Sequence, residues 1–420
     1  MDKINVLVIY TDTLGGVGFY RSTQPHRKLV EMYPDEFNVD FETMPMFHDL
    51  SRFDKYQIIH FHKGVFFNDP AMQDTFTKAL EYFKEKGIVT VMDIDDYWVL
   101  GGHHPQGRSQ HNEKNNPTMV DGVATVKKNF SLVDYVTTTT QFFRKAILPF
   151  NKNVVIFENA IDPTDPNFIV KKEPHDRLRI GFIMGSTHEY DMMLLNNFVA
   201  KLPQEILDKV DIVLCGFDTR GTISTINQDG TVSTRNIKPE ESVWYRYEQM
   251  VTNNYKIVSP EHKAFLMQFT PQSIYPNGYN EHYRRFWTKT MDKYYQHYKE
   301  IDVLFAPLEE NAFNEKKSEL KLIECCFSHT AFVGSNFAPY TIGTRNLIKK
   351  GGEIDPDGNS ILIDKVRCHK DWAKTVERLV KHPEYVQILQ DNLYRDFHEK
   401  YDLRNVTKRR AEWYREIIKK

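Results

Sequence analysis

Apolar and polar positions alternate along the chain in two patterns. Short runs rich in Val, Ile and Phe are typical of buried strands, and longer segments with an apolar residue every three or four positions are typical of amphipathic helices. In the first part the predicted strands are INVLVIY, FNVDFETM, YQIIHFH, GIVTVMD, YVTTTT and NVVIFENAID, with helices predicted over residues 20–33 and 70–86. This order predicts parallel βαβ units rather than a β-meander or a helical bundle.

The alternation is interrupted once and then restarts. Residues 162–176, DPTDPNFIVKKEPHD, contain three prolines and no periodicity, which predicts a connection between domains. Further strands are predicted at LRIGFIMGS, VDIVLCGF, YKIVSP, IDVLFAPL, AFVGS and SILID. We therefore expect two doubly wound α/β halves, and an inserted hairpin or loop over the polar residues 218–240.

A helix predicted between IDVLFAPL and AFVGS carries an unusual charge pattern. At about 100° per residue, Lys317, Lys321 and Glu324 form one narrow stripe on an otherwise apolar surface. Glu319 interrupts the apolar pattern in the first turn, where we expect it to be exposed. One interpretation is a solvated salt-bridge row. The other is a ligand site, because the start of this helix should lie beside the carboxyl ends of parallel strands, where open α/β sheets bind ligands.

Composition sets limits on the class of protein. The chain of 420 residues has 55 basic and 57 acidic side chains, and a net charge of −2 gives no overall attraction to nucleic acid or anionic lipid. Its four cysteines form no CxxC pair, which favours a reducing compartment and no structural zinc. The start shows no signal-peptide pattern, and no stretch reaches the roughly 18 apolar residues of a membrane span. We expect a cytoplasmic protein.

A glycine-rich loop follows the first predicted strand. Gly15 and Gly16 would let the backbone approach a ligand closely, although a tight turn without a ligand explains them as well. The spacing differs from GxGxxG, and no acidic residue ends a clear second strand, so a nicotinamide cofactor is not expected. Arg21, just inside the next helix, suits either a phosphate or carboxylate ligand or a neighbouring acid.

An acidic cluster follows the strand GIVTVMD. Asp93, Asp95 and Asp96 repel one another unless a cation, hydrogen-bond donors or water separate them. A DxD pattern after a strand can bind a divalent metal that holds a nucleotide-sugar diphosphate, as in the single-domain GT-A glycosyltransferases. The structural alternative is an acidic strand end stabilised by the start of the next helix. Four histidines occupy similar positions, and each alone is more often structural than catalytic: His60, His62, His103 and His104.

The second half resembles the retaining GT-B glycosyltransferases of the family-four ("group 1") type. Residues 159–162 resemble its Asn-Gly-Ile-Asp segment at the domain junction, with Ala160 in place of glycine. Residues 178–195 resemble the strand, glycine loop and helix that open the donor domain, and VDIVLCGF resembles the next strand, ending at Gly216. Residues 301–340 resemble the donor-site signature, with Glu324 at its final glutamate. The C-terminal segment resembles the family's closing helices.

Two departures from the family pattern concern charge. The family usually has a glutamate eight positions before the last one, where this chain has Lys316. Its basic pair after the first donor-domain strand is also missing, since residues 185–191, GSTHEYD, contain neither lysine nor arginine. Lys317 and Lys321 would then take over the diphosphate charge, and the family analogy places Glu324 on the ribose hydroxyls.

The resemblance implies a GT-B fold, in which two Rossmann-like domains face a cleft. Residues 1–165 would form the acceptor domain, residues 175–398 the donor domain, and residues 399–420 a helix that crosses back to the first domain. The implied enzyme moves a sugar from a nucleoside-diphosphate sugar to a hydroxyl acceptor, such as a glycan or lipid-linked glycan, with retention. It requires no cofactor and no metal.

Two sets of residues follow for this activity. The predicted donor-binding residues are Gly15, Gly16, Arg21, Gly185, Ser186, Gly216, Lys317, Ser318, Lys321 and Glu324. The predicted catalytic residues are His62, Asp95, Asp96 and Lys317.

Three alternatives remain open at this point. A GT-A-like metal enzyme built on Asp93 and Asp95 would leave the second series of strands without a purpose. A catalytically inactive GT-B module could bind nucleotide sugars as a sensor or assembly subunit. The acceptor could also be a hydroxylated base in DNA, which the near-neutral charge disfavours. Peripheral contact with a membrane is left open too.

Overall fold

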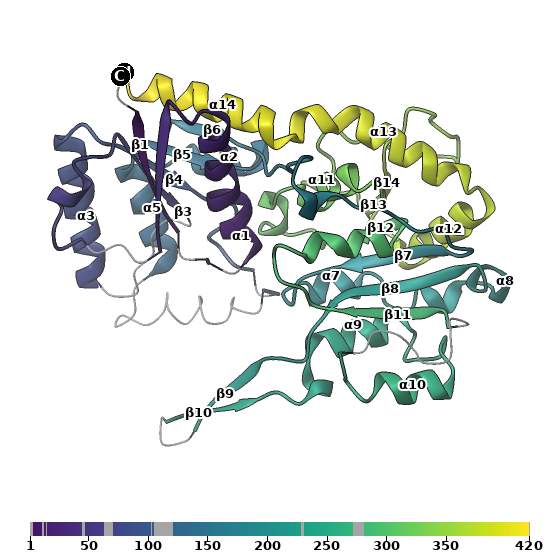
Figure 1. The fold of residues 1–420 in the computed structure, drawn as a ribbon. Helices are drawn as coiled ribbons and strands as arrows, with labels where there is room; N and C mark the ends of the chain where they lie inside the picture. The colour runs from purple at the N-terminus through teal and green to yellow at the C-terminus, as the bar shows by residue number, and fades with distance from the viewer. Residues whose placement is uncertain are drawn as a thin grey trace. The chain divides into compact units, whose positions relative to one another are not determined.

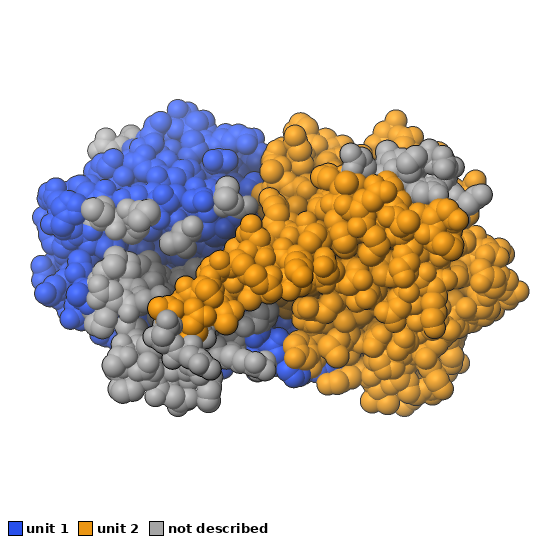
Figure 2. Space-filling view, turned by 90° about the horizontal axis from the view of Figure 1, so that it is seen from below, with its two compact units in different colours: residues 1–165, 310–323, 397–420 blue, residues 166–309, 324–396 orange. Residues whose placement is uncertain are grey.

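The computed structural model describes residues 3–10, 12–13, 15–43, 47–62, 70–101, 103–104, 121–227, 231–271 and 281–419. The chain forms two compact units, coloured separately in Figure 2. Unit 1 comprises residues 1–165, 310–323 and 397–420, and unit 2 comprises residues 166–309 and 324–396. Each unit is built around a parallel sheet of its own.

The sheet of unit 1 has six parallel strands in the order β2-β1-β3-β4-β5-β6, and Figure 1 labels β1 and β3 to β6. The strands are β1 (Ile4–Ile9), β2 (Phe37–Glu42), β3 (Ile58–His62), β4 (Val89–Asp93), β5 (Tyr135–Thr138) and β6 (Val154–Ile156). β2 and β3 lie on opposite sides of β1, so the order of strand addition reverses there. Such a topological switch point opens a crevice at the carboxyl ends of the two strands. The βαβ pattern predicted for this half is confirmed.

Helices connect the strands of unit 1 and cover its sheet. Within the described residues they are α1 (Gly16–Gly18), α2 (Gln24–Met32), α3 (Pro70–Glu85), α5 (Gly122–Leu132) and α6 (Gln141–Ile147), with a π-helical turn over Phe19–Thr23 before α2. Polar side chains begin two of them. Asp121 accepts a hydrogen bond from the backbone N–H of Ala124, and Thr140 from that of Phe143, as N-cap residues do.

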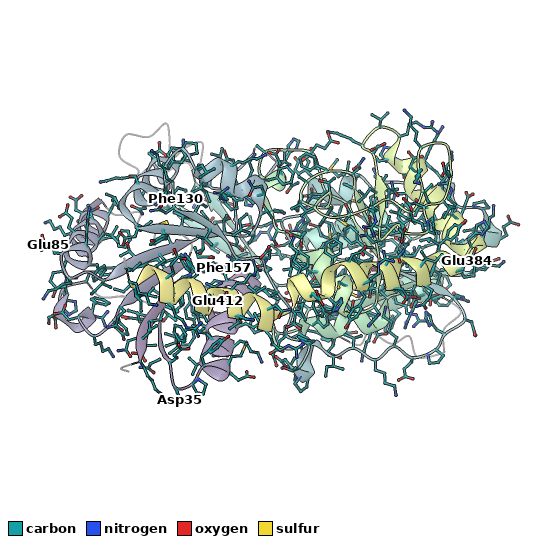
Figure 3. The ribbon with its side chains drawn as sticks, turned by 90° about the horizontal axis from the view of Figure 1, so that it is seen from above. Asp35, Glu85, Phe130, Phe157, Glu384 and Glu412 are labelled. Atoms are coloured by element: carbon teal, nitrogen blue, oxygen red, sulfur yellow. The ribbon has the colours of Figure 1, made fainter. Side chains whose placement is uncertain are left out.

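The C-terminal helix α14 (Leu403–Ile417) belongs to unit 1 and packs on α2 (Figure 1). Its residues Ala411, Tyr414 and Ile417 are buried in one cluster with residues of β1 and α2. Figure 3 shows Phe157 close to this helix, and Trp413 contacts its ring at 5.3 Å between centroids. The predicted return of the terminal helix to the first domain is confirmed.

Removal of residues 402–420 should therefore give an unstable or aggregating chain. The truncation would expose the apolar side chains of Val6 and Leu29, which α14 helps to cover. Solubility and thermal melting of the truncated and full-length proteins measure the effect, and removal of residues 419–420 alone serves as the control. A soluble truncation with an unchanged melting temperature would contradict this role of α14.

The sheet of unit 2 also has six parallel strands, in the order β11-β8-β7-β12-β13-β14. They are β7 (Leu178–Ile183), β8 (Val210–Phe217), β11 (Tyr283–Trp287), β12 (Val303–Ala306), β13 (Ala331–Ser335) and β14 (Ile361–Ile363). Here β8 and β12 lie on opposite sides of β7, which places the switch point between β7 and β12. β9 (Thr222–Ile226) and β10 (Val232–Asn236) form the antiparallel hairpin that was one of the two predictions for residues 218–240.

One predicted strand of unit 2 is wrong. Residues 255–260, YKIVSP, form a turn that leads into α10 (Pro260–Leu266), and the outer strand is β11 instead. Asn253, Asn254 and Tyr255 all have positive φ angles of 51° to 65°, which is left-handed backbone that a strand excludes. The segment reads as apolar because it packs beneath α9 (Val243–Val251), with Tyr255 buried in the core.

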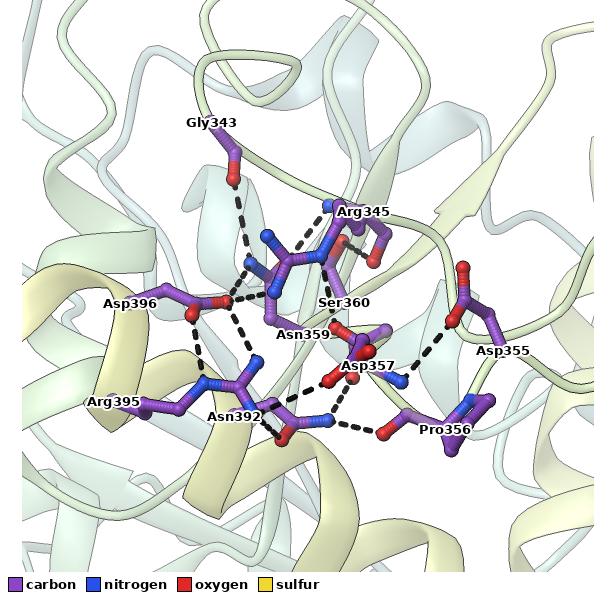
Figure 4. Close-up of polar contacts among 11 residues, drawn as sticks. Gly343, Arg345, Asp355, Pro356, Asp357, Asn359, Ser360, Asn392, Arg395 and Asp396 are labelled. Carbon is purple, nitrogen blue, oxygen red and sulfur yellow. Dashed lines mark hydrogen bonds and ion pairs between the residues drawn. The ribbon is translucent and has the colours of Figure 1, made fainter.

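Helices α7 (Glu189–Met193), α8 (Gln204–Leu207), α12 (Cys368–Lys381) and the first part of α13 (Glu384–Tyr401) complete unit 2. A polar network joins the loop before β14 to α13 (Figure 4). Asp396 accepts hydrogen bonds from Arg345 at 2.6 Å and from Asn359 at 2.8 Å. We assign this network a structural role, because its partners satisfy one another. Among the described helices, none is long and apolar enough to span a membrane.

Candidate functional site

The helix predicted to carry Lys317 and Lys321 begins later in the sequence than expected. Helix α11 runs from Leu320 to Phe327, whereas Lys317 follows a 3-10 turn and has extended backbone, with φ −61° and ψ 162°. The prediction that three charged residues form a stripe on one helix is therefore wrong for Lys317. It holds for Lys321 and Glu324, which both lie on α11. The side chains of the two residues after Lys317 explain the late start.

Both residues between Lys317 and α11 are held by other parts of unit 1. Ser318 accepts a hydrogen bond from the side chain of Asn159 at 2.9 Å, and Glu319 accepts one from the Tyr401 hydroxyl at 2.6 Å. Glu319 is only 2% exposed, so its predicted exposure is wrong. Burial raises the pKa of the Glu319 carboxyl, and the Tyr401 hydrogen bond opposes that rise. These contacts fix the position of Lys317.

Glu324 belongs to unit 2 and is completely buried. One carboxylate oxygen accepts a hydrogen bond from the Tyr294 hydroxyl, and the other accepts one from the Tyr298 hydroxyl at 2.7 Å. Sequence reasoning missed both tyrosines, although the run YYQHY stands just before the strand IDVLFAPL. Ribose hydroxyls would have to share or replace these donors, and the ribose contact of Glu324 stays a prediction.

The glycine loop after β1 is closed by an aspartate that sequence reasoning missed. Asp12 accepts hydrogen bonds from the backbone N–H groups of Gly15 at 2.7 Å and Gly18 at 3.1 Å. A Cβ atom on Gly18 would lie 1.8 Å from the backbone carbonyl oxygen of Asp12, so the loop requires glycine there, whereas a Cβ on Gly15 would displace the Asp12 carboxylate. An Asp three residues before a glycine is the signal for such a turn. The donor contacts predicted for Gly15 and Gly16 remain untested, and the Gly15 N–H already has a partner.

Arg21 and Asp93 form a buried ion pair within unit 1. Two guanidinium nitrogens of Arg21 donate to the Asp93 carboxylate at 2.6 and 2.9 Å, and a third donates to the carbonyl of Phe157 and to Asn159. Arg21 is 1% exposed and Asp93 is fully buried. Burial opposes the charge on Asp93, but Arg21 holds the pKa of that carboxyl well below its usual range. For Arg21 the sequence left two partners open, a phosphate or carboxylate ligand and a neighbouring acid. The structure shows the neighbouring acid, Asp93.

The ends of β3 and β4 bring two predicted catalytic residues together. His62 Nε2 lies 3.9 Å from a carboxylate oxygen of Asp95, and both side chains are buried. They lie at the carboxyl end of the unit 1 sheet, next to the switch point between β1 and β3. Their arrangement suits a proton-accepting pair, because the carboxylate can stabilise a protonated imidazole.

Residues around Lys317 reach the same acidic segment. The ring of His104 lies 4.9 Å from that of Phe313, and the Lys317 ammonium lies 5.3 Å from the Phe313 ring. Burial lowers the pKa of His104, the positive charge of Lys317 lowers it further, and the negative charge of Asp96 raises it. Lys317 and Asp96 thus act electrostatically on one imidazole. The structure thus brings His62 beside Asp95, and it places Lys317 and His104 against the same ring of Phe313; the chemical roles of these residues stay predictions.

A buried histidine in this unit should make the protein sensitive to acid. Burial lowers the pKa of His60 to about 3, against the attraction of Asp93. Below pH 6.5 the unfolded chain binds a proton at this residue that the folded chain does not, so stability falls as the pH falls towards 3. This contribution approaches about 1.4 kcal/mol per pH unit in that window. Urea unfolding between pH 7 and 4.5 measures it.

His60→Gln should make the pH dependence of stability between pH 6.5 and 4.5 less steep, since the variant has no imidazole at position 60, while buried His26, whose pKa burial also lowers, keeps its own contribution. His103→Gln is the matched control, because His103 is exposed. Equal slopes for wild type and His60→Gln would contradict the assignment.

In unit 2, the loop after β7 begins at the switch point. The Tyr247 hydroxyl lies 3.2 Å from the carbonyl of Gly185 and 3.3 Å from that of Ser186, and donates to this pair. Gly216 follows in the adjacent strand with a φ of 93°, and a Cβ there would lie 3.2 Å from the Trp244 ring. Gly216 therefore has a structural reason to be glycine. The donor contacts predicted for these three residues stay predictions.

His188 is the basic side chain that sequence reasoning missed in GSTHEYD. Its Nδ1 lies 2.6 Å from an oxygen of Asp191, and the other oxygen of Asp191 accepts from the backbone N–H of Glu309 at 2.7 Å. Asp191 thereby ties the loop after β7 to the loop after β12, on either side of the switch point. The sequence signal for this contact was the spacing, since a histidine three positions before an aspartate can bond to it across one helical turn. It matters because the loop lacks the lysine and arginine expected there.

The described residues contain no group of three or more histidine, cysteine or acidic side chains arranged to hold a metal. Asp93, one of the carboxylates considered for a metal, accepts hydrogen bonds from Arg21 and Thr137. The single-domain GT-A architecture is also wrong for this chain, because two separate six-stranded parallel sheets are present.

Two parallel Rossmann-like sheets and the terminal helix α14 define a GT-B fold, the architecture of many nucleotide-sugar glycosyltransferases. An alpha-glucosyltransferase (AGT) in complex with UDP matches with a TM-score of 0.56 and 11% identity, over 100% of both chains. A UDP-forming alpha,alpha-trehalose-phosphate synthase from Burkholderia xenovorans also matches with a TM-score of 0.56 and 11% identity, over 99% of both chains. TarM matches with a TM-score of 0.50 and 12% identity, over 86% of this chain and 55% of its own.

Neither a protein-family model nor a curated protein sequence matches the chain. Identities of 11 to 12% show a common fold and nothing finer. The GT-B part of the family resemblance is confirmed, and its retaining family-four part stays a prediction.

Proposed function

We propose that the protein is a glycosyltransferase that moves a sugar from a nucleoside-diphosphate sugar to a hydroxyl acceptor, with retention at the anomeric carbon. The observation that carries this proposal is the placement of Lys317 in unit 1. Asn159 and Tyr401 hold the residues that follow it, and its ammonium group lies 5.3 Å from the ring of Phe313, which also contacts His104. A fixed cation beside candidate acid and base groups suits a reaction with an anionic leaving group.

The reaction breaks the bond between the anomeric carbon and the diphosphate oxygen and forms one to the acceptor oxygen. The leaving diphosphate gains negative charge, which Lys317 and Lys321 would stabilise together with the hydroxyl of Ser318. The acceptor hydroxyl loses its proton, and we assign this proton to the pair of His62 and Asp95. Such a mechanism needs no metal and no cofactor.

In unit 2 we add His188 to the donor contacts first predicted for Gly185 and Ser186. Its Nδ1 is held by Asp191, and we assign its Nε2 to a phosphate oxygen, where the family pattern has its basic pair. The loop starts at the switch point between β7 and β12, where α/β sheets bind ligands.

Replacement of His188 by asparagine should weaken the affinity for the nucleoside diphosphate by about tenfold, since a charge-assisted hydrogen bond contributes about 1.5 to 3 kcal/mol. Calorimetric titration with UDP measures the change. Glu189→Gln is the neighbouring control, because Glu189 is paired with Arg246 on the surface. Unchanged affinity in His188→Asn would remove this residue from the site.

A uridine diphosphate sugar is the first donor to test, because similar folds have been solved with UDP and with UDP-glucose. Thermal-shift measurements with UDP-, GDP- and ADP-sugars would select the donor, and mass analysis of the products would then identify the acceptor. Transfer to a hydroxylated base in DNA is a second candidate, since AGT structures that match the whole chain contain DNA. Binding of a donor without transfer or hydrolysis would identify an inactive sensor module instead. A cytoplasmic location is part of the same proposal.

A further inference from the structure

A cavity of about 560 Å³ lies within unit 1, apart from the residues assigned to the donor. Its wall combines aromatic rings with basic side chains. The lining residues used below are Tyr97, Trp98, Lys127, Phe142, Lys145 and Lys316. The volume is within the roughly 300 to 1,000 Å³ of pockets that bind small ligands.

The position of the cavity connects it with the predicted chemistry. Tyr97 and Trp98 directly follow the acidic residues Asp95 and Asp96 in the sequence. On another side, Lys316 directly precedes Lys317. The cavity is therefore bordered by two of the three segments of unit 1 that carry predicted catalytic residues, the third being the end of β3 with His62.

The charges around the cavity favour an anion. Lys127, Lys145 and Lys316 line it, against one carboxylate, Glu315. The Lys316 side chain forms an ion pair with Glu315, and its ammonium group lies 5.1 Å from the centre of the Tyr97 ring. Lys127 lies 5.5 Å from the ring of Phe150, and no described carboxylate is within ion-pair distance of Lys127 or Lys145. Two ammonium groups are thus left for a ligand, and we expect them to bind a phosphate or a carboxylate.

The aromatic wall favours a ring next to that anion. Tyr97, Trp98 and Phe142 come from the segment after β4 and from α6, and their faces suit the apolar face of a sugar ring. A sugar phosphate fits the volume of the cavity.

We infer that this cavity is an acceptor subsite that binds a phosphate-bearing sugar unit. The acceptor role rests on the proposed glycosyltransferase function, whereas the binding of the sugar phosphate can be tested without any turnover.

Calorimetric titration of the full-length chain with glucose 6-phosphate tests the inference. Lys127→Met and Lys145→Met keep the length of the side chain and remove its charge, so each should weaken binding by at least about fivefold. Lys128→Met is the matched control, because Lys128 follows Lys127 on α5, is exposed and does not line the cavity. Glucose should bind more weakly than its phosphate, and the affinity for UDP should be unchanged in all three variants.

The inference is overturned if glucose 6-phosphate fails to bind a protein that binds UDP. Equal losses in Lys128→Met and the two cavity variants would overturn it as well. A competition experiment would also overturn it, if AMP or a short oligonucleotide binds through Lys127 and Lys145 and glucose 6-phosphate does not. If no nucleotide sugar is turned over but glucose 6-phosphate binds through Lys127 and Lys145, the proposed function fails and the binding site is supported.

Discussion

Lys317→Ala and Lys321→Ala are each expected to weaken donor binding and to slow transfer by about ten- to a hundredfold. Each change removes a charge-assisted hydrogen bond to phosphate, which contributes about 1.5 to 3 kcal/mol. Both lysines are only partly buried, so the loss of the side chain leaves no core cavity. Calorimetry with the preferred nucleotide sugar, together with thermal melting of each variant, measures the two effects separately.

The salt-bridge interpretation of the same lysines predicts a different result. Each substitution would then cost at most about 0.5 kcal/mol of stability and leave donor affinity unchanged. Lys374→Ala, at an exposed position of α12, is the control for the general loss of a positive charge. Wild-type donor affinity in both lysine variants would rule out the site assignment.

Glu324→Gln separates a ligand contact from a structural one. The carboxylate accepts from Tyr294 and Tyr298, so an amide in its place loses one acceptor oxygen inside the core. A drop in melting temperature without a drop in donor affinity would mean that Glu324 serves the tyrosines alone.

Removal of either partner of the Arg21–Asp93 pair should give the largest loss of stability. Arg21→Met leaves a buried carboxylate without its cation, and breaking such a pair costs about 3 to 5 kcal/mol. Asp93→Leu leaves Arg21 buried without its anion and should cost a similar amount. The double variant should lose less than the sum of the two, because it leaves no unpaired charge.

Urea unfolding at pH 7 of the wild type, the two single variants and the double variant forms the thermodynamic cycle. Arg52→Met is the control, since Arg52 pairs with Glu42 at the surface and should change stability by less than about 1 kcal/mol. Single variants as stable as this control would contradict the role of the buried pair.

The strands of both sheets could be predicted because buried parallel strands are almost continuously apolar. β11 was missed for the opposite reason: its sequence, YRRFW, contains two arginines. Arg285 is nevertheless buried, because it pairs with Glu248 on α9 and packs on the ring of Phe217. No local pattern in the sequence reveals a partner that lies 37 positions away.

The candidate site shows the same limit. The sequence places His62 and Asp95 at strand ends, and the structure brings them together, because the carboxyl ends of neighbouring parallel strands meet at one edge. The hydrogen bonds of Glu324 to Tyr298, and of Glu319 to Tyr401, join residues 26 and 82 positions apart. These contacts decide which acids are exposed, and helical periodicity alone carries no information about them.

The most direct test of the account is nucleoside-diphosphate release from a panel of nucleotide sugars by the full-length wild type and by a Lys317→Ala/Lys321→Ala variant. We expect the wild type to release the diphosphate from at least one nucleotide sugar, with or without added acceptor, and the double variant to remain folded and lose this release. A wild type that binds a nucleotide sugar but never releases its diphosphate, or a double variant that is as active as the wild type, would contradict the account.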